Sequence, residues 1–179
     1  MRVIRGKYGH RRFDVPKSFN ARPTTDFAKE NLFNILSNRF DFERLSAIDL
    51  FSGTGSIALE LVSRGCSSVT SVEKRREHAA FIRTLIKRLN EENCWRVFET
   101  DVFHFLERNK ECRRFDLVFA DPPYTLAELE SLPTKVLESN ILAEDGLFIL
   151  EHPKDFSFTE HTRFEEHRAY GSVNFTFFR

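Results

Sequence analysis

A carboxylate, two prolines and an aromatic ring follow one another at positions 121–124, as Asp121, Pro122, Pro123 and Tyr124. The preceding run, 115–120, is largely apolar and predicts a strand buried on both faces of a parallel sheet. Ligands of open α/β sheets bind outside the carboxyl ends of the strands, so this block is placed to meet a substrate. An ordinary helix start capped by Asp121 is the alternative, although an aromatic residue directly after two prolines is an unusual way to begin a helix.

A turn with two glycines, at 49–55, forms a second candidate site. Gly53 and Gly55 permit a tight passage from a strand to a helix and let a ligand approach the backbone, while the helix presents free N–H groups. With Ala58 the spacing is that of the dinucleotide fingerprint. Glu73 follows 20 residues after Gly53, at the end of the next predicted strand, where an acid suits ribose hydroxyls. Together these features favour an adenosine-containing cofactor over an ordinary turn.

Four predicted strands end in a carboxylate, and a parallel sheet brings those ends to one edge. The acids are Asp49, Glu73, Asp101 and Asp121. Helix capping explains one such acid, for example Asp101, but not four in succession. NAD and S-adenosylmethionine both present an adenosine to this edge. The pyrophosphate of NAD favours a helix start without competing anions, whereas the sulfonium and ammonium groups of S-adenosylmethionine attract carboxylates. The pattern therefore favours S-adenosylmethionine.

From residue 46 onwards, strand-like and helix-like segments alternate, which predicts an α/β fold with a doubly wound, mostly parallel sheet. We expect strands at 47–51, 69–73, 95–98, 115–120 and 146–151, and helices at 57–65, 79–89, 102–109 and 126–139. An earlier helix is capped by Thr24 or Thr25 and ends near Phe40. The tail alternates apolar and polar residues on both sides of Gly171, over 164–170 and 173–178, and predicts an antiparallel hairpin.

Residues 1–22 form a basic segment, here called the N-terminal arm, with seven basic residues and one acid in a chain of zero net charge. Segments 2–5 and 12–15 read as the strands of a short hairpin. Aromatic rings interleave the charges, which suits contact with phosphates and bases, although a charge run is often only a solvated face. The arm is too short for its own core, so 23–179 is expected to be the single domain. The predicted RNA contacts are Arg2, Arg5, Lys7, Arg11, Arg12 and Arg22.

Composition argues against several classes of protein. The 179 residues suit one domain, 20 of them are Phe, and no run approaches the roughly 18 apolar residues of a membrane span. Cys66, Cys94 and Cys112 are widely spaced without a zinc or redox pattern, and the six histidines lack metal-ligand spacing. We therefore expect a soluble, cytoplasmic monomer that has neither a metal nor a membrane partner.

The candidate sites together resemble a known family. The 49–55 turn, Glu73, Asp101 and the 121–124 block are similar to class I S-adenosylmethionine-dependent methyltransferases, with a Rossmann-like fold, that modify exocyclic amino groups of bases. A narrower resemblance, to the RsmD-type 16S rRNA guanine-N2 methyltransferases, rests on Ile4-Arg5-Gly6, Arg22-Pro23-Thr24-Thr25-Asp26, Glu30, Leu32-Phe33-Asn34 and Tyr170-Gly171. This chain departs from that family at Arg5, where a glycine is usual, and at Phe27, where an arginine is usual.

The resemblance implies a cofactor site around the glycine turn. Glu73 is expected to hold the ribose hydroxyls, and Asp101 with Val102 the adenine. Thr24 and Thr25 are expected to bind the carboxylate of the methionine part. The full set of predicted cofactor residues is Thr24, Thr25, Asp49, Phe51, Gly53, Gly55, Glu73, Asp101, Val102 and Asp121.

The 121–124 block suits methylation of an amine, whose lone pair is otherwise delocalised into the base. Asp121 can accept one N–H and the Pro122 carbonyl another, which directs the lone pair at the methyl group. Pro123 stiffens the turn and Tyr124 stacks on the base. The target base must leave its stack to enter such a pocket. A further candidate for the pocket wall is Glu151-His152-Pro153, at the end of the fifth predicted strand.

Other functions stay open at this stage. The block alone does not separate guanine N2 from adenine N6 or cytosine N4, nor RNA from DNA. An NAD-dependent oxidoreductase is a rival enzyme, and an RNA-binding module without catalysis is a rival of another class. The expected partner is ribosomal RNA, either free or within the small-subunit ribonucleoprotein particle.

Overall fold

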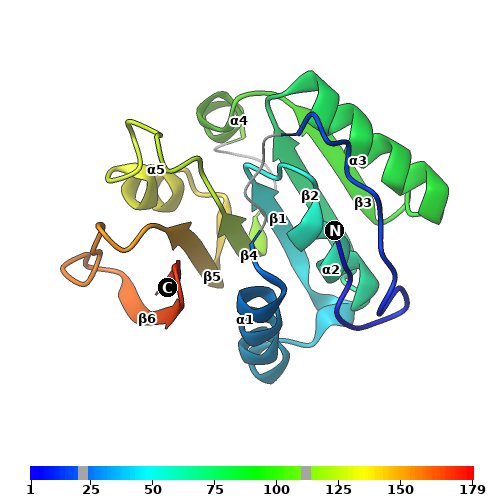
Figure 1. The fold of residues 1–179 in the computed structure, drawn as a ribbon. Coiled ribbons are helices and arrows are strands. Elements are labelled where there is room, and N and C mark those ends of the chain that lie inside the picture. The colour runs from blue at the N-terminus through cyan, green and yellow to red at the C-terminus, as the bar shows by residue number, and fades with distance from the viewer. Residues whose placement is uncertain (20–23, 110–113) are drawn as a thin grey trace.

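The structure, a computed structural model, describes residues 1–19, 24–109 and 114–179. A seven-stranded sheet lies between two layers of helices (Figure 1). Its strands are β1 Ser46–Leu50, β2 Ser68–Glu73, β3 Trp95–Glu99, β4 Phe115–Ala120, β5 Leu142–His152, β6 Phe164–Tyr170 and β7 Val173–Phe178. The helices are α1 Asp26–Arg39, the short 3₁₀ helix η1 Phe42–Arg44, α2 Ser56–Ser63, α3 Arg76–Leu89, α4 Val102–Arg108 and α5 Leu132–Glu138. The predicted fold class is confirmed.

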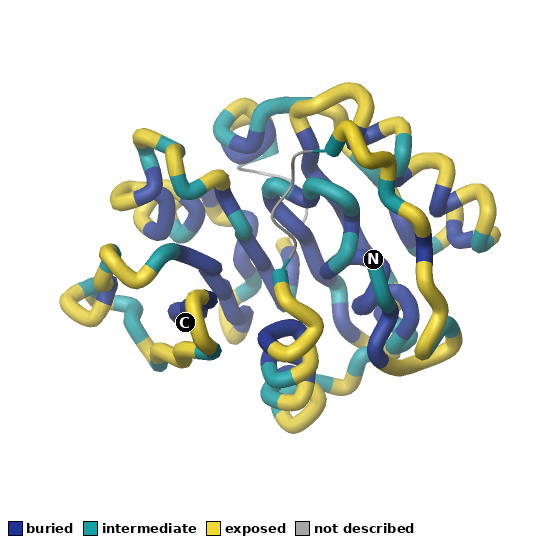
Figure 2. The backbone as a smooth tube through the Cα atoms, in the orientation of Figure 1, coloured by how far each residue is buried: buried dark blue, intermediate teal, exposed yellow. Residues whose placement is uncertain are grey.

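The two layers follow from the alternation of apolar side chains along the strands. In β1, Ala47 packs into the core formed with α1, α2 and α3. Its neighbour Ile48 points the other way, into the core formed with α4 and α5. Figure 2 shows the result, a central sheet whose strands are mostly buried beneath helices with exposed outer faces.

The order of the strands is β3-β2-β1-β4-β5-β7-β6. Ile48 of β1 stands opposite Thr70 of β2 on one side and Val118 of β4 on the other, and both pairings are parallel. The chain therefore winds outward from β1 to β3 and then returns to begin β4 beside β1. Such a reversal opens a crevice at the carboxyl ends of the two central strands. The last two strands form the predicted antiparallel hairpin.

The predicted helix over 126–139 is too long. The chain makes successive turns before α5, with Leu129 N donating to Leu126 O at 3.2 Å, and α5 begins only at Leu132. Pro133 lies in the first helical turn, where a missing N–H has no intrahelical acceptor to lose. The proline therefore marks the start of the helix and not an interruption of it.

The predicted start of the fifth strand, residue 146, is also wrong. Strand β5 begins at Leu142, which pairs with Phe115; the next pair is Leu117 with Leu147, so β5 carries extra residues between the two pairs. Glu144 and Asp145 are exposed within this irregular part. Their polarity made the first residues of the strand look like a loop.

The predicted N-terminal hairpin is present but shorter than expected. One antiparallel bridge joins Arg2 and Arg12, and Val3 N donates to Arg11 O at 3.0 Å. Val3 and Phe13 are buried in the main core, so the hairpin packs as part of the domain. The expected boundary between residues 22 and 23 lies outside the described residues.

A glycine allows the arm to dock against the C-terminal end of α2. Gly6 has a φ of +87°, and a Cβ at this position would lie 1.9 Å from Ser63 O. The next amides use this close approach, with Lys7 N donating to Ser63 O at 2.7 Å and Tyr8 N to Ser63 Oγ at 3.0 Å. The arm thus supplies donors to the end of a helix, where carbonyl groups lack intrahelical partners.

Two buried charges fix the arm more firmly. The carboxylate of Glu60 accepts from Ile4 N at 2.7 Å and from Arg5 N at 3.1 Å. Lys29, also buried, donates to a carbonyl of the arm and, at 3.1 Å, to Ser56 Oγ at the start of α2. Both ends of α2 are therefore tied to the arm.

Candidate active site

A cavity of about 530 Å³ opens at the carboxyl ends of β1, β2 and β4. This volume lies within the roughly 300–1,000 Å³ of small-molecule sites. The predicted residues that line it are Thr24, Asp49, Phe51, Gly53, Glu73, Asp101, Val102, Asp121, Pro122, Pro123 and Tyr124. Residues far apart in the sequence thus meet in the crevice that the strand order creates.

The glycine turn has an unusual backbone. Phe51, Gly53 and Gly55 all have positive φ angles, of 62°, 54° and 74°. Such a conformation is uncommon for a non-glycine residue and stores strain at Phe51. A Cβ at Gly53 would meet only Phe51 O, at 3.9 Å. The open side of Gly53 therefore leaves room for a ligand against the backbone.

Two of the predicted cofactor residues serve the framework of the site. Gly55 is outside the residues that line the cavity, and a Cβ there would lie 3.1 Å from Ile82 Cγ1 and 3.2 Å from Trp95. Gly55 therefore lets the turn pack closely on α3 and β3. Thr25 caps α1 by accepting from Ala28 N at 3.2 Å, and it also lies outside this cavity.

Asp49 lies at the buried floor of the cavity. Its Oδ2 accepts from Ser52 Oγ at 2.6 Å and from Ala58 N at 3.3 Å. Burial raises its pKa to about 7, against the lowering effect of these hydrogen bonds. Asp49 therefore carries only part of a negative charge near neutral pH, less than its position in the sequence indicates.

The other acids are held by backbone amides. Glu73 accepts from Gly53 N at 2.8 Å through one oxygen and from Arg75 N at 2.7 Å through the other. Asp101 caps α4 by accepting from Phe103 N at 3.0 Å. Capping and ligand binding are compatible, because each carboxylate oxygen can accept more than one hydrogen bond. Both carboxylates are thus fixed in direction at the cavity wall.

The 121–124 block forms the edge of the cavity where β4 ends. Asp121 N donates to Leu50 O at 3.4 Å, which extends the pairing of β4 with β1 by one residue. Leu126 N donates to Pro123 O at 2.8 Å and closes the turn that follows. Asp121 and Tyr124 are both half-buried. A carboxylate and an aromatic ring therefore share one rigid rim.

Sequence reasoning missed one aromatic residue that lines the cavity, Phe103. Phe103 lines the cavity with its ring centroid 6.5 Å from that of Phe51, in an edge-to-face arrangement. Lys135 Nζ lies 4.6 Å from the centroid of Phe103. In a chain with 20 Phe, the only signal for Phe103 was its place two residues after Asp101.

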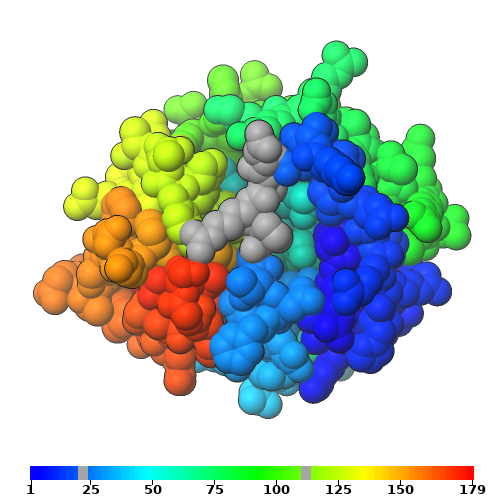
Figure 3. All heavy atoms as spheres, in the orientation of Figure 1, coloured from blue at the N-terminus to red at the C-terminus, as the bar shows by residue number. Residues whose placement is uncertain are grey.

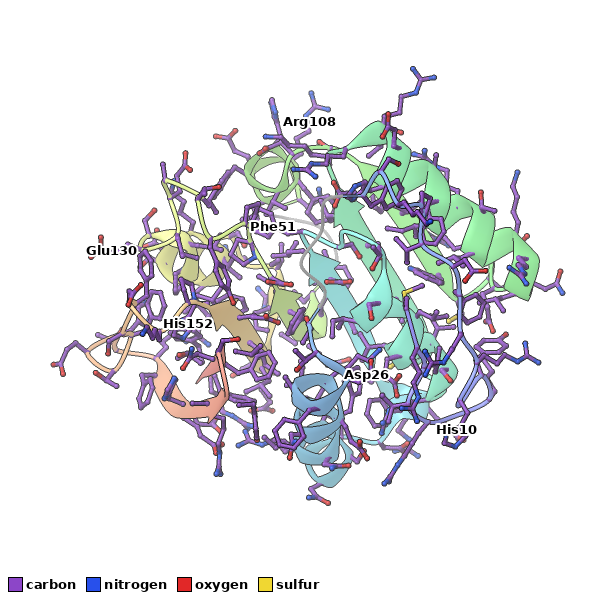
Figure 4. All side chains as sticks on the ribbon, in the orientation of Figure 1. His10, Asp26, Phe51, Arg108, Glu130 and His152 are labelled. Atoms are coloured by element: carbon purple, nitrogen blue, oxygen red, sulfur yellow. The ribbon has the colours of Figure 1, made fainter. Side chains whose placement is uncertain are left out.

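The end of β5 is split between the cavity and the core. Glu151 lines the cavity and accepts from Thr24 Oγ1 at 2.9 Å. His152 is buried beside it, with Nε2 2.8 Å from Thr176 Oγ1, and burial lowers its pKa. Figure 4 shows His152 and Phe51 in different parts of the molecule. Of the three residues proposed at this strand end, only Glu151 lines the cavity.

The basic residues of the arm have different surroundings. Arg2 Nη1 lies 3.8 Å from Asp26, Lys7 Nζ lies 2.5 Å from Glu91, and the Arg11 guanidinium lies over the Tyr8 ring. Two further predicted contacts, Arg5 and Arg12, are exposed on the same arm. Arg22 lies outside the described residues. Figure 4 places His10 at the tip of the arm, away from Phe51 and the cavity.

The described ranges, 1–19, 24–109 and 114–179, contain no cluster of His, Cys, Asp and Glu suited to a metal ion. Within the same ranges no helix is long and apolar enough to cross a membrane. Cys66 and Cys94 are free thiols, and Cys112 lies outside the described residues.

Residues 1–179 match, along their whole length, a protein-family model described as "Conserved hypothetical protein 95". The chain belongs to this family. A relative from Bacillus subtilis (strain 168), "Putative rRNA methyltransferase YlbH", is 32% identical over 89% of this chain and 86% of its own. "Ribosomal RNA small subunit methyltransferase D" of Escherichia coli (strain K12) is 30% identical over 84% of this chain and 74% of its own. The resemblance predicted from the sequence is thereby confirmed.

Solved structures of similar proteins have the same fold. A hypothetical protein of Thermus thermophilus, TTHA0928, superposes with a TM-score of 0.87 at 30% identity and covers 100% of this chain and 99% of its own. The putative methyltransferase yhhF from Escherichia coli gives 0.84 at 26% identity, with 99% and 96% covered. The arm, the sheet and the terminal hairpin therefore belong to one shared architecture.

Proposed function

We propose that this protein transfers a methyl group from S-adenosylmethionine to the exocyclic N2 amine of a guanine in small-subunit ribosomal RNA. The observation that carries the proposal is the position of Asp121–Tyr124 at the rim of the cavity, beside the glycine turn. The relatives support the substrate class, because they are named as ribosomal RNA methyltransferases. Neither an NAD-dependent oxidoreductase nor a module without catalysis has comparable support.

The cavity suits S-adenosylmethionine in its charge and shape. We assign the ribose hydroxyls to Glu73, the adenine to Asp101 with Val102, and the methionine part to the glycine turn and Thr24. The open side of Gly53 admits a ligand to the backbone, and the acids around it attract a cation. When bound, the cofactor supplies a methyl group on a positively charged sulfur.

The rim residues are suited to activate an amine whose lone pair is delocalised into a base. The Asp121 carboxylate accepts one N–H and the Pro122 carbonyl accepts the other, which turns the lone pair toward the methyl group. The same acceptors stabilise the positive charge that develops on nitrogen. Tyr124 stacks on the base, and Pro123 restricts the turn. After the N–C bond forms, the cationic amine releases its proton to Asp121 or to water.

The arm completes the proposed enzyme by holding the RNA. A guanine must leave its stack to reach the rim, which requires contacts to the neighbouring phosphates. Arg5, Arg11 and Arg12 offer positive charge for this purpose on a docked, ordered surface. We place the arm, 1–22, and the domain, 23–179, in one monomer that acts on ribosomal RNA or the small-subunit particle in the cytoplasm.

The test is transfer of tritium from methyl-labelled S-adenosylmethionine to 16S rRNA, supplied both free and as small subunits from a strain that lacks the enzyme. Nuclease digestion and mass spectrometry then identify the product nucleoside. We expect N2-methylguanosine. Recovery of N6-methyladenosine or N4-methylcytosine would retain amine methylation but overturn the guanine assignment, and the absence of transfer to either substrate would contradict the proposal.

A further inference from the structure

Phe27 is unusually exposed for its type. It lies in the first turn of α1, and 66% of its surface is accessible. Phe98, at 47%, is the other large hydrophobic residue with an exposed side chain in the part of the chain that the structure describes. A single exposed apolar residue needs no functional explanation by itself. The surroundings of Phe27 are what distinguish it.

Tyr170 supports Phe27 from the side. The two ring centroids are 6.1 Å apart and the planes meet at 79°, an edge-to-face contact. Tyr170 in turn lies 6.1 Å, between centroids, from Phe175, which is buried in the core. The Tyr170 ring is thus anchored against the core, and it fixes the position of the exposed Phe27 ring. We call Phe27 and Tyr170 the aromatic pair.

The aromatic pair lies at the same edge of the sheet as the cavity. Thr24, three residues before Phe27, lines the cavity and is bonded to Glu151. Strand β7 runs against β5, with Asn174 opposite His152, so the turn that follows Tyr170 lies at the carboxyl end of β5. The start of α1 and the β6–β7 turn therefore flank the rim from one side.

The charge beside the aromatic pair points to a nucleic acid as its ligand. Asp26 pairs with Arg2 at 3.8 Å, which joins the start of α1 to the basic arm. A groove of about 570 Å³ runs between the start of α1 and the arm and shares Thr24 with the main cavity. Its charged lining residues are Arg2, Arg12 and Lys17 together with Asp14 and Asp26, so basic groups outnumber acids. Figure 3 shows the arm, α1 and the terminal hairpin side by side on one face. Basic residues that hold phosphates next to an aromatic surface are the arrangement used for single-stranded nucleic acids.

We propose that the aromatic pair stacks an unpaired base that neighbours the target nucleotide, while the basic arm holds the adjoining phosphates. The proposal rests on the proposed function for its substrate, an RNA strand with its target base turned out. It adds a contact that no part of the methylation chemistry requires. Phe27 supplies the stacking face, and Tyr170 acts as the positioning residue behind it.

The experiment measures binding of fluorescein-labelled single-stranded oligoadenylate, by anisotropy, to the full-length protein and its variants. Phe27→Ala should weaken binding at least about fivefold, since stacking on an aromatic ring contributes roughly 1–3 kcal/mol per base. Phe27→Trp should retain wild-type affinity, and Phe98→Ala, on β3 at the other end of the strand order from β6, should do the same. Because stacking involves no ion release, the salt dependence of binding should not change in Phe27→Ala.

An abasic strand of the same length separates bases from phosphates. On that strand the wild type and Phe27→Ala should bind equally, and a persistent defect would overturn the proposal. A defect seen only with assembled small subunits, with none on naked RNA, would overturn it too and assign the pair to a protein partner. Failure of methyl transfer would leave these binding results interpretable, because none of them depends on turnover.

Discussion

Asp121 is the residue on which the proposed chemistry depends most directly, because it joins the end of β4 to the rim of the cavity. We expect Asp121→Ala to slow methyl transfer by about 100-fold or more, the usual effect of removing a group that acts in the transition state. Affinity for S-adenosylmethionine should fall much less. Single-turnover transfer and calorimetry measure the two quantities separately. Turnover close to that of the wild type would show that Asp121 is not the acceptor.

Asp49 predicts a pH dependence of stability. Its pKa is raised from 3.8 to about 7 in the folded protein, chiefly by burial. The folded state therefore binds more protons than the unfolded state between those values, and stability falls as pH rises through that range. Asp49→Asn keeps an acceptor for Ser52 and Ala58 without the charge. The variant should gain stability relative to the wild type by a few kcal/mol as pH rises from about 4 to above 7.

Urea denaturation of both proteins at a series of pH values measures this difference. A constant difference in the free energy of unfolding across the range would mean that Asp49 is ionised at ordinary pH in the folded protein. Asp49 would then carry a full negative charge that attracts the cationic groups of S-adenosylmethionine.

For single residues, the sequence predicts which residue types stand at the strand ends but not what surrounds them in the fold. Glu73 and Asp121 were found because chain order alone brings strand ends to one edge of the sheet. The raised pKa of Asp49 was not, because it depends on burial beneath the glycine turn. Phe103 was missed for a similar reason, since nothing in the sequence distinguishes a cavity-lining Phe from a core Phe.

Among the elements, the arm depends on one glycine for its contact with α2. Gly6→Ala combines an unfavourable φ with a Cβ placed 1.9 Å from Ser63 O. Gly171→Ala is a matched control, because its φ is also positive, at +65°, but a Cβ there meets nothing within 4 Å. We expect the control to lose about 1 kcal/mol and Gly6→Ala to lose clearly more. Urea denaturation measures the free energy of unfolding of both variants. Equal losses would mean that the arm moves away from α2 to accommodate the Cβ at no cost in stability.

The charge on the arm predicts the salt dependence of RNA binding. Replacing Arg11 and Arg12 by Glu should weaken binding and reduce the slope of log K against log salt by about 0.7 for each phosphate of a single strand that the arm no longer neutralises. Arg44→Glu is a control that reverses one such charge, half the change of the double variant, at a site that is 90% exposed on η1. An unchanged slope in the double variant would show that the arm is only a solvated surface.

Element boundaries were predicted well where capping chemistry is local. Thr24 or Thr25 was expected to cap α1, and Thr25 does. The start of α5 and the start of β5 were wrong, because Pro133 was read as an interruption and Glu144 with Asp145 as a loop. The docking of the arm could not be predicted either, since Glu60 and Ser63 are far from residues 4–8 along the chain.

For the molecule as a whole, the buried Glu60 predicts that arm and domain unfold together. Glu60 bonds two arm amides and Arg64 Nε at 2.8 Å. Glu60→Gln removes the charge from a buried pair, which typically costs about 3–5 kcal/mol.

Fluorescence of Trp95, the single tryptophan, reports the core, and proteolysis at Lys7 reports the arm. The two transitions should coincide in the wild type, and separate transitions would define the arm as an independent unit.

The fold class and the seven strands were predictable, because alternation of strands and helices allows few arrangements. The strand order was not predicted from the residues, although it is the order that opens the crevice at β1 and β4. The meeting of α1 with the β6–β7 turn, which creates the aromatic pair, is a property of the folded molecule alone.

The attachment of the arm to α2 also sets a sequence of events during synthesis. The amide of Ile4 and the carboxylate that holds it are 56 residues apart, so the arm has no docking surface until α2 has emerged and formed. Closing so long a loop costs entropy before any contact repays it. A nascent chain therefore displays its most basic segment, undocked, until α2 has emerged and formed. The segment synthesised early must wait for a later one before it reaches its native place.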